Sequence, residues 1–364
     1  MKILIISLAG IGDTLLATPL IHELGANFPD AQIDALVLWA GSRDLLEGNP
    51  HLNTIFQHNF LKESRVSSLR FLWPLRGAHY DISINAHPQS RIHYRATARF
   101  IGAHRRISHI YDCSGFLDNL LVNETLRQDY QKHSVDLNLE LLGLFKKSAA
   151  LPKHSLEIFL SDAEHAWAEA FLKENNLQQQ PRLGLHVGSG GTKNLALKRW
   201  PLAHYIKLLG KVRQSWPNLA ILLFGGPEEE PDLQKILEEH KSPLVIRVRS
   251  QNLRQAAALM QRCSAFLSVD TALMHIAAAV KTPNQIVIEA PTFNKTNEPY
   301  GNPFVLVRNP ALAGRNLEYY RYDGKGIHGS TEELIRIMGS VSPETVYETL
   351  AKISFGRPSS ASAQ

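Results

Sequence analysis

Residues 2–14 read Lys-Ile-Leu-Ile-Ile-Ser-Leu-Ala-Gly-Ile-Gly-Asp-Thr, and this stretch decides the fold class of the chain. The unbroken apolar run 2–8 is typical of a strand that is buried on both faces of a parallel sheet. Gly10 and Gly12 permit a tight turn, and apolar residues at helical spacing over 15–24 predict a helix after it. A strand, a glycine turn and a helix in this order indicate an α/β protein with a doubly wound sheet.

Asp13 is the unusual residue of this turn. Gly10 and Gly12 suggest a dinucleotide-binding fingerprint, but Leu15 stands where its third glycine belongs. A carboxylate at the pyrophosphate position would also repel the anion, so an NAD-dependent dehydrogenase is only weakly supported. Asp13 is better suited to accepting a proton, with a solvated helix cap as the alternative interpretation.

Residues 268–275, Ser-Val-Asp-Thr-Ala-Leu-Met-His, form a second strand-to-helix junction. They follow a short apolar run and precede an Ala-rich segment with helical spacing. Asp270 and Thr271 are therefore expected at a helix N-terminus, where side chains cap backbone amides and phosphates or sugar hydroxyls bind. His275 lies four residues beyond Thr271, on the same helical face. An ordinary capped core helix is the alternative.

Length and composition narrow the class of protein. At 364 residues, with 44% hydrophobic and 20% charged residues, the chain is expected to form two globular domains. Cys113 and Cys263 are too few for a disulfide framework or a zinc site, which favours a reducing compartment. Met1-Lys2 leads directly into the first strand, and no apolar run approaches the length of a membrane span, so a cytoplasmic location is predicted.

Basic residues dominate the segment 60–110, where Glu63 and Asp81 are the only acidic side chains. This excess predicts an anionic partner, either a phosphorylated small molecule or an anionic lipid head group, unless it is simply a solvated face. No nucleic-acid-binding motif accompanies it, so nucleic acid is not expected as a partner. The basic residues are Lys62, Arg65, Arg70, Arg76, Arg91, Arg95, Arg99, Arg105 and Arg106.

Strand and helix patterns alternate along both halves of the chain. A connector at 152–160 separates them, so we expect one domain over 1–157, another over 158–340, and a terminal segment 341–364 with a helix that crosses back and a disordered tail. Each half resembles a nucleotide-binding module, and two such modules are expected to face a central cleft. The predicted strands are 2–8, 33–38, 55–56, 80–85, 106–107, 183–187, 220–224, 244–248, 265–269 and 285–289.

Three loops of the second half are expected to form one donor pocket, because each follows a strand or lies close to one. Gly188-Ser189-Gly190-Gly191-Thr192-Lys193 can wrap phosphates with backbone amides. Lys198 in Lys-Arg-Trp-Pro can neutralise a diphosphate. The third loop is Phe-Gly-Gly-Pro-Glu-Glu-Glu, residues 224–230, whose glycines allow close approach and whose carboxylates suit ribose hydroxyls; a plain turn before an acidic helix start is the alternative.

Together these motifs resemble glycosyltransferase family 9, the ADP-heptose:lipopolysaccharide heptosyltransferases, over nearly the whole chain. The resemblance implies a GT-B fold with two Rossmann-like domains, and metal-independent, inverting transfer of heptose from ADP-heptose to a lipopolysaccharide inner-core or related acceptor. The ADP-sugar is a co-substrate, and no cofactor is implied. Carried over by position, Asp13 resembles the general base, Lys198 the diphosphate contact, Glu229 the ribose contact, and Asp270, Thr271 and His275 the sugar and phosphate contacts. With the residues of the glycine turns and the helix start added, the predicted donor-binding set is Gly12, Gly188, Ser189, Gly225, Glu229, Asp270, Thr271, Ala272 and His275.

Some positions depart from the family pattern, and they concern the donor more than the fold. Ala272 replaces the usual glycine after Asp-Thr, extra residues separate 188–193 from Lys198, and Glu-Ala-Pro-Thr at 289–292 replaces an aromatic-Gly-Pro-Thr motif. Another nucleotide-sugar transferase or epimerase of the same fold, and a non-catalytic glycan-binding relative, therefore remain alternatives.

The acceptor is expected on the basic first half. Arg91, Arg95 and Arg99 are spaced to share one helical face, where they would bind an anionic lipid-linked acceptor. This predicts peripheral contact with the inner face of the cytoplasmic membrane.

Overall fold

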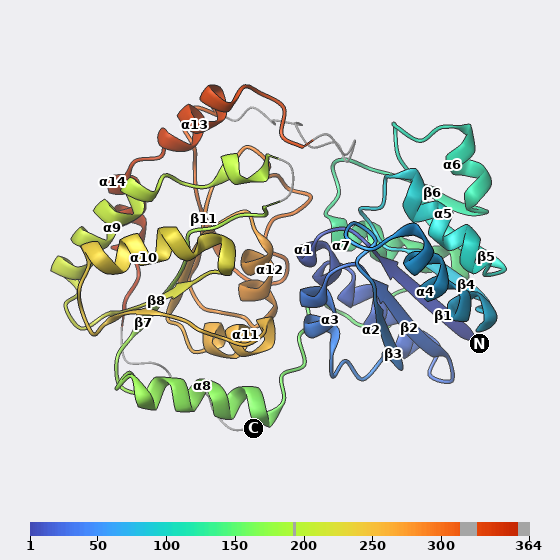
Figure 1. The fold of residues 1–364 in the computed structure, drawn as a ribbon, viewed down its shortest axis with the longest axis horizontal. Coiled ribbons are helices and arrows are strands. Elements are labelled where there is room, and N and C mark those ends of the chain that lie inside the picture. Colours follow the sequence, from blue (N-terminus) through green and yellow to red (C-terminus); the bar gives the residue numbers. More distant parts are fainter. Residues whose placement is uncertain (192–193, 314–325, 356–364) are drawn as a thin grey trace. The chain divides into compact units, whose positions relative to one another are not determined.

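The computed structural model describes residues 1–191, 194–313 and 326–355, and the chain divides into two compact units (Figure 1). The first unit contains Met1–Phe159 and Lys295–Tyr300. The second contains the described parts of Leu160–Asn294, Gly301–Tyr320 and Gly326–Gln364. Each unit is built on one six-stranded parallel sheet.

The first sheet has the strand order β3-β2-β1-β4-β5-β6. Strands β2 and β3 are added on one side of β1, and β4, β5 and β6 on the other side, so the order of strands reverses beside β1. This is the order of dinucleotide-binding folds, in which ligands bind beyond the carboxyl ends of the strands near the reversal. The strands are β1 (Lys2–Ser7), β2 (Gln32–Val37), β3 (Thr54–Gln57), β4 (Ile82–Asn85), β5 (Arg105–Ile110) and β6 (Glu124–Arg127).

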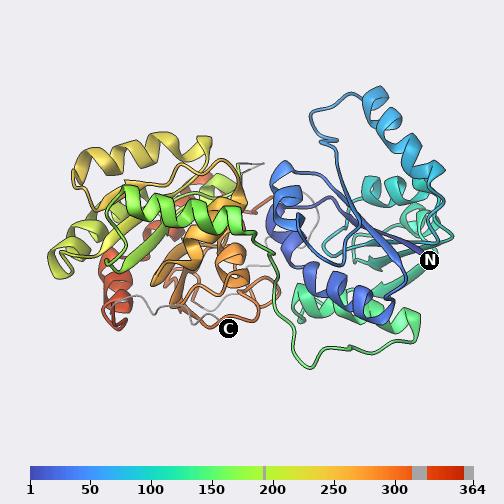
Figure 2. The same cartoon turned by 90° about the horizontal axis from the view of Figure 1, so that it is seen from below.

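Helices cover both faces of the first sheet because alternate strand residues point to opposite sides. Ile3 and Ile5 pack with α2, while Leu4 and Ile6 pack with α4 and α5. Figure 2 shows α2 and α4 on opposite sides of the strands. The helices of this unit are α1 (Ile11–Leu15), α2 (Thr18–Asn27), α3 (Ala40–Leu46), α4 (Arg65–Gly77), α5 (Ile92–Ile101), α6 (Phe116–Leu121), α7 (Ser134–Glu140) and the 3-10 helix η1 (Leu141–Phe145).

The helix predicted after the first glycine turn is two helices. α1 ends at Leu15, and α2 starts at Thr18 with Pro19 in its first turn. Proline has no N–H to donate, and its ring clashes with the carbonyl four residues earlier, which here belongs to Leu15. The residues that follow β1 therefore form a short helix of their own, α1, and the longer, buried helix α2 begins after it.

The second sheet has the order β12-β11-β10-β7-β8-β9, the same topology built from later strands. The α/β class predicted from the sequence is confirmed. The strands are β7 (Arg182–His186), β8 (Ala220–Phe224), β9 (Val245–Arg247), β10 (Ala265–Val269), β11 (Gln285–Ile288) and β12 (Phe304–Val307).

The second sheet also lies between two helix layers. One core combines strand side chains with α9, α10 and α14, and α11 packs with α8 and α12. The helices are α8 (Asp162–Glu174), η2 (Leu195–Lys198), α9 (Leu202–Ser215), η3 (Pro227–Glu229), α10 (Glu230–Glu239), α11 (Leu253–Gln261), α12 (Ala272–Ala279), α13 (Thr331–Gly339) and α14 (Pro343–Leu350). In the described parts of the chain, none of the helices has the length and apolar character that crossing a bilayer requires.

The prediction that the terminal helix crosses back to the first domain is wrong. α14 packs against α9, and Val346 and Leu350 are buried in the core of the second unit. Its apolar face complements that core, a relation that its amphipathic pattern alone does not reveal. The predicted disordered tail from residue 356 lies outside the described residues.

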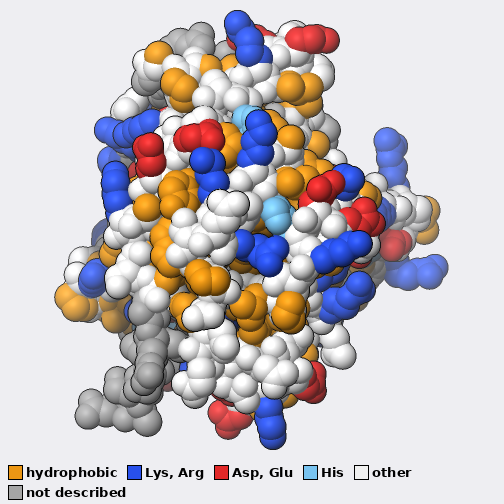
Figure 3. Space-filling model, turned by 90° about the vertical axis from the view of Figure 1, so that its left-hand side faces the viewer, with side chains coloured by type: hydrophobic (Ala, Val, Ile, Leu, Met, Phe, Trp, Pro, Cys, Tyr) orange, Lys and Arg blue, Asp and Glu red, His pale blue; other side chains and the backbone are white. Residues whose placement is uncertain are grey.

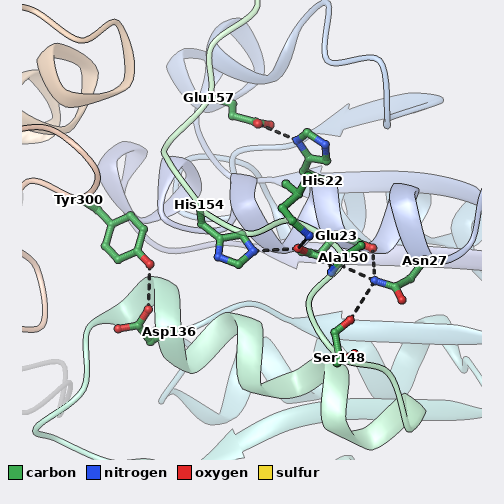
Figure 4. A network of polar contacts seen from close by, with 10 residues as sticks. His22, Glu23, Asn27, Asp136, Ser148, Ala150, His154, Glu157 and Tyr300 are labelled. Atoms are coloured by element: carbon green, nitrogen blue, oxygen red, sulfur yellow. Dashed lines mark hydrogen bonds and ion pairs between the residues drawn. The ribbon is translucent and has the colours of Figure 1, made fainter.

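Glu23 of α2 anchors the end of the first unit's chain. Its fully buried carboxylate accepts hydrogen bonds from the backbone N–H groups of Ala150 (2.7 Å) and Leu151 (2.9 Å), and lies 2.8 Å from Nε2 of His154. Figure 4 shows this network, with the neighbouring pair of His22 and Glu157. Burial alone would raise the pKa of Glu23, but these hydrogen bonds and the charge of His154 outweigh it, so the pKa is lowered.

We predict that Glu23→Gln lowers the free energy of unfolding by about 2–3 kcal/mol at pH 7, because an amide cannot accept all of these bonds as an anion does. The lowered pKa means that the carboxylate stabilises the fold above its ordinary value of 4.5 and ceases to do so as the pH falls through the folded value. Urea denaturation at several pH values checks this, with exposed Glu63→Gln as the control. An equal loss in both variants would contradict it.

Candidate functional site

The carboxyl edge of the second sheet brings together most of the predicted donor-binding residues. β11, β10, β7 and β8 are neighbours in this sheet. The segments that follow them contain Thr292, Asp270, Ser189 and Glu229, respectively. Because parallel strands all end at the same edge, residues more than 100 positions apart lie on one side of the unit.

Lys198 and Asp270 form a buried ion pair at this edge. The Nζ of Lys198 lies 3.3 Å from Oδ2 of Asp270 and 3.4 Å from Oγ1 of Thr292. The Thr292 hydroxyl in turn donates to the same Asp270 oxygen at 2.6 Å. An ammonium group has three donors, so Lys198 can hold a ligand oxygen in addition to these two partners.

Asp270 remains an anion in this setting. Burial acts to raise the pKa of its carboxyl, but the charge of Lys198, the hydrogen bond from Thr292 and the nearby His275 together lower it. His275 is itself buried, one turn into α12. The site thus pairs a fixed cation with a fixed anion.

Thr271, rather than Asp270, occupies the N-cap position of α12, and its side chain makes no capping hydrogen bond. The Thr271 hydroxyl lies 3.3 Å from Nδ1 of His186, which ends β7. Burial first, and then the charges of Arg199 and Lys198, lower the pKa of His186 to about 3, so its imidazole is neutral. Ala272 is the first helical residue, which places its methyl group at the positive end of the helix dipole.

Glu229 lies in a second part of the site, after β8, and has its own set of hydrogen bonds. Arg199 donates to its Oε1 at 2.9 Å, and the backbone N–H of Gly226 donates to its Oε2 at 2.9 Å. Burial nevertheless raises the pKa of Glu229 above its ordinary value, although both partners act to lower it. Arg199 also reaches Ser189, whose hydroxyl donates to the carbonyl of Leu195.

The glycines of this part of the site leave room for Glu229 itself. A Cβ on Gly188 would lie 2.4 Å from Oε1 of Glu229, and one on Gly225 would lie 2.9 Å from its Cβ. A Cβ on Gly191 would meet Glu228. The predicted close approach of a ligand to Gly188 and Gly225 is thus accompanied by close packing of protein side chains. Thr192 and Lys193 of the same loop lie outside the described residues.

Arg199, Thr292 and His186 were not predicted as site residues. Arg199 adjoins Lys198 in the Lys-Arg-Trp-Pro motif, and Thr292 follows the strand beside β10, so position after a strand was the signal that could have identified Thr292. Within the described ranges, no three His, Cys, Asp or Glu side chains are grouped as metal ligands.

Asp13 lies in the first unit, on the turn after β1. Its Oδ2 accepts a 2.7 Å hydrogen bond from the backbone N–H of Gly10, which caps α1. A Cβ on Gly10 would lie only 2.9 Å from that oxygen, so this glycine is needed for the carboxylate to fold back. Gly12 lies within α1 itself. Asp13 is half-buried and is held in a defined orientation.

Tyr94 of α5 lies near Asp13, and Arg91 lies near Tyr94. Burial raises the pKa of the Tyr94 hydroxyl, the negative charge of Asp13 adds to this, and the positive charge of Arg91 opposes it. The Tyr94 hydroxyl is therefore within electrostatic reach of both Asp13 and Arg91. Arg91 occupies the N-cap position of α5, and Tyr94 was not predicted as a site residue.

The prediction that Arg91, Arg95 and Arg99 form one acceptor-binding face is wrong for Arg95. Arg95 is only 1% exposed and forms a 2.7 Å ion pair with Asp118. It also donates to the carbonyls of Ser90 and His109 and to the Ser114 hydroxyl. Arg99 is exposed, one turn further along the helix. Arg95 therefore joins α5 to the segment that leads into α6.

We predict that Arg95→Ala lowers the free energy of unfolding by about 3–5 kcal/mol, because Asp118 would lose its buried partner. Arg99→Ala on the same helix should change it by less than about 0.5 kcal/mol. Thermal unfolding of the two variants provides the comparison. Similar stabilities would show that Arg95 does not hold this unit together.

Asp270→Asn should likewise destabilise the protein by about 3–5 kcal/mol at pH 7, since Lys198 would remain buried without its counter-charge. The matched control is Glu169→Gln, because Glu169 is exposed and its half-buried partner Arg262 lies 2.9 Å away, and the expected loss is about 1 kcal/mol or less. Because the pKa of Asp270 is lowered, its contribution is present above the ordinary value of 3.8 and disappears as the pH falls through the folded value. Denaturant titrations at pH 7 and at acidic pH test both statements.

The chain is similar to known proteins in both sequence and structure. Lipooligosaccharide heptosyltransferase 2 of Haemophilus influenzae is 26% identical to it, over 97% of this chain and 100% of the relative. A glycosyl transferase family 9 structure from Veillonella parvula has a TM-score of 0.76 at 20% identity, covering 97% of this chain and 96% of its own. The structure of Escherichia coli ADP-heptose lps heptosyltransferase II has a TM-score of 0.72 at 21% identity, covering 97% and 98%.

The fold likeness confirms the GT-B type of architecture implied by the sequence resemblance. The family model of glycosyltransferase family 9 (heptosyltransferase) matches residues 69–321, more than half of the chain. The chain therefore belongs to glycosyltransferase family 9.

Proposed function

We propose that this protein is an inverting heptosyltransferase that moves a heptose from ADP-heptose to a lipopolysaccharide inner-core acceptor. The observation that carries the proposal is the buried group formed by Lys198, Asp270 and Thr292 at the carboxyl edge of the second sheet. Family membership supports the reaction class. The names of the relatives, a lipooligosaccharide heptosyltransferase and an ADP-heptose lps heptosyltransferase, support the donor and the acceptor.

The second unit would bind the donor. Lys198 and the N-terminal end of α12 supply positive potential for a diphosphate. Asp270 is an ionised acceptor for sugar hydroxyls, with Thr271 and His275 beside it. Glu229, held by Arg199, is suited to the hydroxyls of a ribose. Ala272 would place a methyl group where a glycine would allow a ligand to approach the helix more closely.

The first unit would activate the acceptor. A sugar hydroxyl is a weak nucleophile at neutral pH, and Asp13 would take its proton as the oxygen attacks the anomeric carbon of the heptose. A bond forms between that carbon and the acceptor oxygen, and the bond to the diphosphate oxygen breaks on the opposite face. ADP departs with the bonding electron pair, and the configuration inverts. Lys198 would stabilise the charge that develops on the leaving group.

Arg91 and Tyr94 are our candidates for holding the acceptor, since Tyr94 lies within electrostatic reach of Asp13 and Arg91 within electrostatic reach of Tyr94. A positive guanidinium suits a phosphorylated or carboxylated core sugar. We further propose that the reaction takes place on the cytoplasmic side of the inner membrane and requires no metal ion.

The decisive experiment compares Asp13→Asn with the wild type in an ADP-release assay with ADP-heptose and a core-oligosaccharide acceptor. Asparagine keeps the shape but cannot accept the proton, so kcat should fall by about 10²- to 10⁴-fold while the KM for the donor changes little. Exposed Asp30→Asn in the same unit is the control. Full activity of Asp13→Asn would rule out Asp13 as the base.

The same assay distinguishes the alternatives. Turnover of a different nucleotide sugar in preference to ADP-heptose would identify another donor. Failure of the wild type to release a nucleotide from any donor, with glycan binding intact, would indicate a non-catalytic relative. Loss of activity in EDTA that is restored by a divalent cation would contradict metal independence.

A further inference from the structure

The exposed apolar side chains of the protein are concentrated in one segment of the first unit. Among the described residues, eleven large hydrophobic side chains are exposed, and eight of them lie between residues 61 and 120. Isolated exposed apolar residues are normal, but a group of them on neighbouring helices indicates a surface with a partner. α4 provides the clearest part of this surface.

α4 has an apolar stripe on its outer face. Val66, Leu69 and Trp73 follow one another at helical spacing and are 68%, 51% and 67% exposed. Leu72 and Leu75 on the inner face are buried in the core of the first unit. The inner face therefore fixes the helix on the sheet, and the outer stripe exists before any partner binds. Over its 13 residues the helix is about 20 Å long.

Positive charge borders this stripe. Residues 61–77 contain four basic side chains and a single acidic one, Glu63. All four basic residues, Lys62, Arg65, Arg70 and Arg76, are exposed, and Arg76 donates to the carbonyl of Phe100. By contrast, on the face of the second unit that Figure 3 shows, Lys and Arg side chains are interspersed with Asp and Glu.

We propose that α4 is a membrane-contact helix that seats the first unit on an anionic lipid surface. Val66, Leu69 and Trp73 would enter the boundary between head groups and acyl chains, and Lys62, Arg65 and Arg70 would meet the lipid phosphates. Charge complementarity favours this occupant, because a basic, apolar surface with an exposed tryptophan matches the interface of an anionic bilayer. The contact does not depend on the transfer reaction; if the proposed function holds, it would also bring the enzyme to a lipid-linked acceptor.

Trp73 reports on the contact directly. The chain has five tryptophans, all within the described residues, and Trp73 is the one whose side chain is exposed. Its emission should shift to shorter wavelength when the full-length protein is mixed with phosphatidylcholine vesicles containing about one-third phosphatidylglycerol, and not with pure phosphatidylcholine. Trp73→Phe should remove this shift while the protein still sediments with the vesicles. Unchanged Trp73 emission in vesicle-bound protein would overturn the proposal.

Matched variants distinguish lipid binding by the α4 stripe from nonspecific binding through any exposed apolar side chain. Val66→Ser combined with Leu69→Ser should weaken vesicle binding at least about tenfold, because two side chains would lose their burial in lipid. Val305→Ser, at a 50% exposed apolar site in the second unit, should bind like the wild type. Replacing Lys62, Arg65 and Arg70 by Gln should remove most of the binding and its dependence on salt.

Two further measurements complete the test. Unfolding temperatures close to the wild-type value, and unchanged ADP release with a delipidated soluble acceptor, would show that the stripe variants lost lipid contact alone. Equal vesicle binding by the stripe variant and Val305→Ser would overturn the proposal. So would sedimentation equilibrium showing a dimer that the stripe variant dissociates, because the occupant would then be a second copy of the chain.

Discussion

The buried attraction between Lys198 and Asp270 is the constraint on which the second unit's site depends. Neither charge is stable alone in a dry environment, so each requires the other to remain in place. The pair joins the end of η2 to the turn between β10 and α12. Thr292 adds the segment after β11 through its hydrogen bond to Asp270. Three separate parts of the chain are thereby fixed relative to one another, as a site with preorganised electrostatics requires.

Hydrogen bonds and close packing also hold Glu229 in one position. Its carboxylate occupies the space beside Gly188, its Cβ lies beside Gly225, and Arg199 donates a hydrogen bond to the carboxylate. A side chain at either glycine would displace the side chain of Glu229. The first unit uses the same device on a smaller scale, where Gly10 allows Asp13 to fold back onto a backbone N–H group. In both units, glycines after a strand determine where a carboxylate points.

The sequence predicted those features that depend on local pattern. β8 and β10 begin and end at the predicted residues because every side chain in them is buried and apolar runs mark their limits. β6 and β12 were not predicted, since each has only four residues, lies at a sheet edge and is partly exposed. The role of Arg95 could not be read from helical spacing either, because its partner Asp118 is 23 residues away and becomes a neighbour only through packing.

Binding of the nucleotide-sugar donor at the carboxyl edge of the second sheet is the proposal on which the assigned roles of Lys198 and Glu229 depend. A crystal structure of the protein with ADP-heptose or an unreactive analogue tests it most directly. We expect diphosphate oxygens about 3 Å from Nζ of Lys198, next to the N-terminal end of α12, and ribose hydroxyls hydrogen-bonded to Glu229. A well-ordered donor bound elsewhere on the chain, with Lys198 and Glu229 each contacting only its present protein partners, would contradict this proposal.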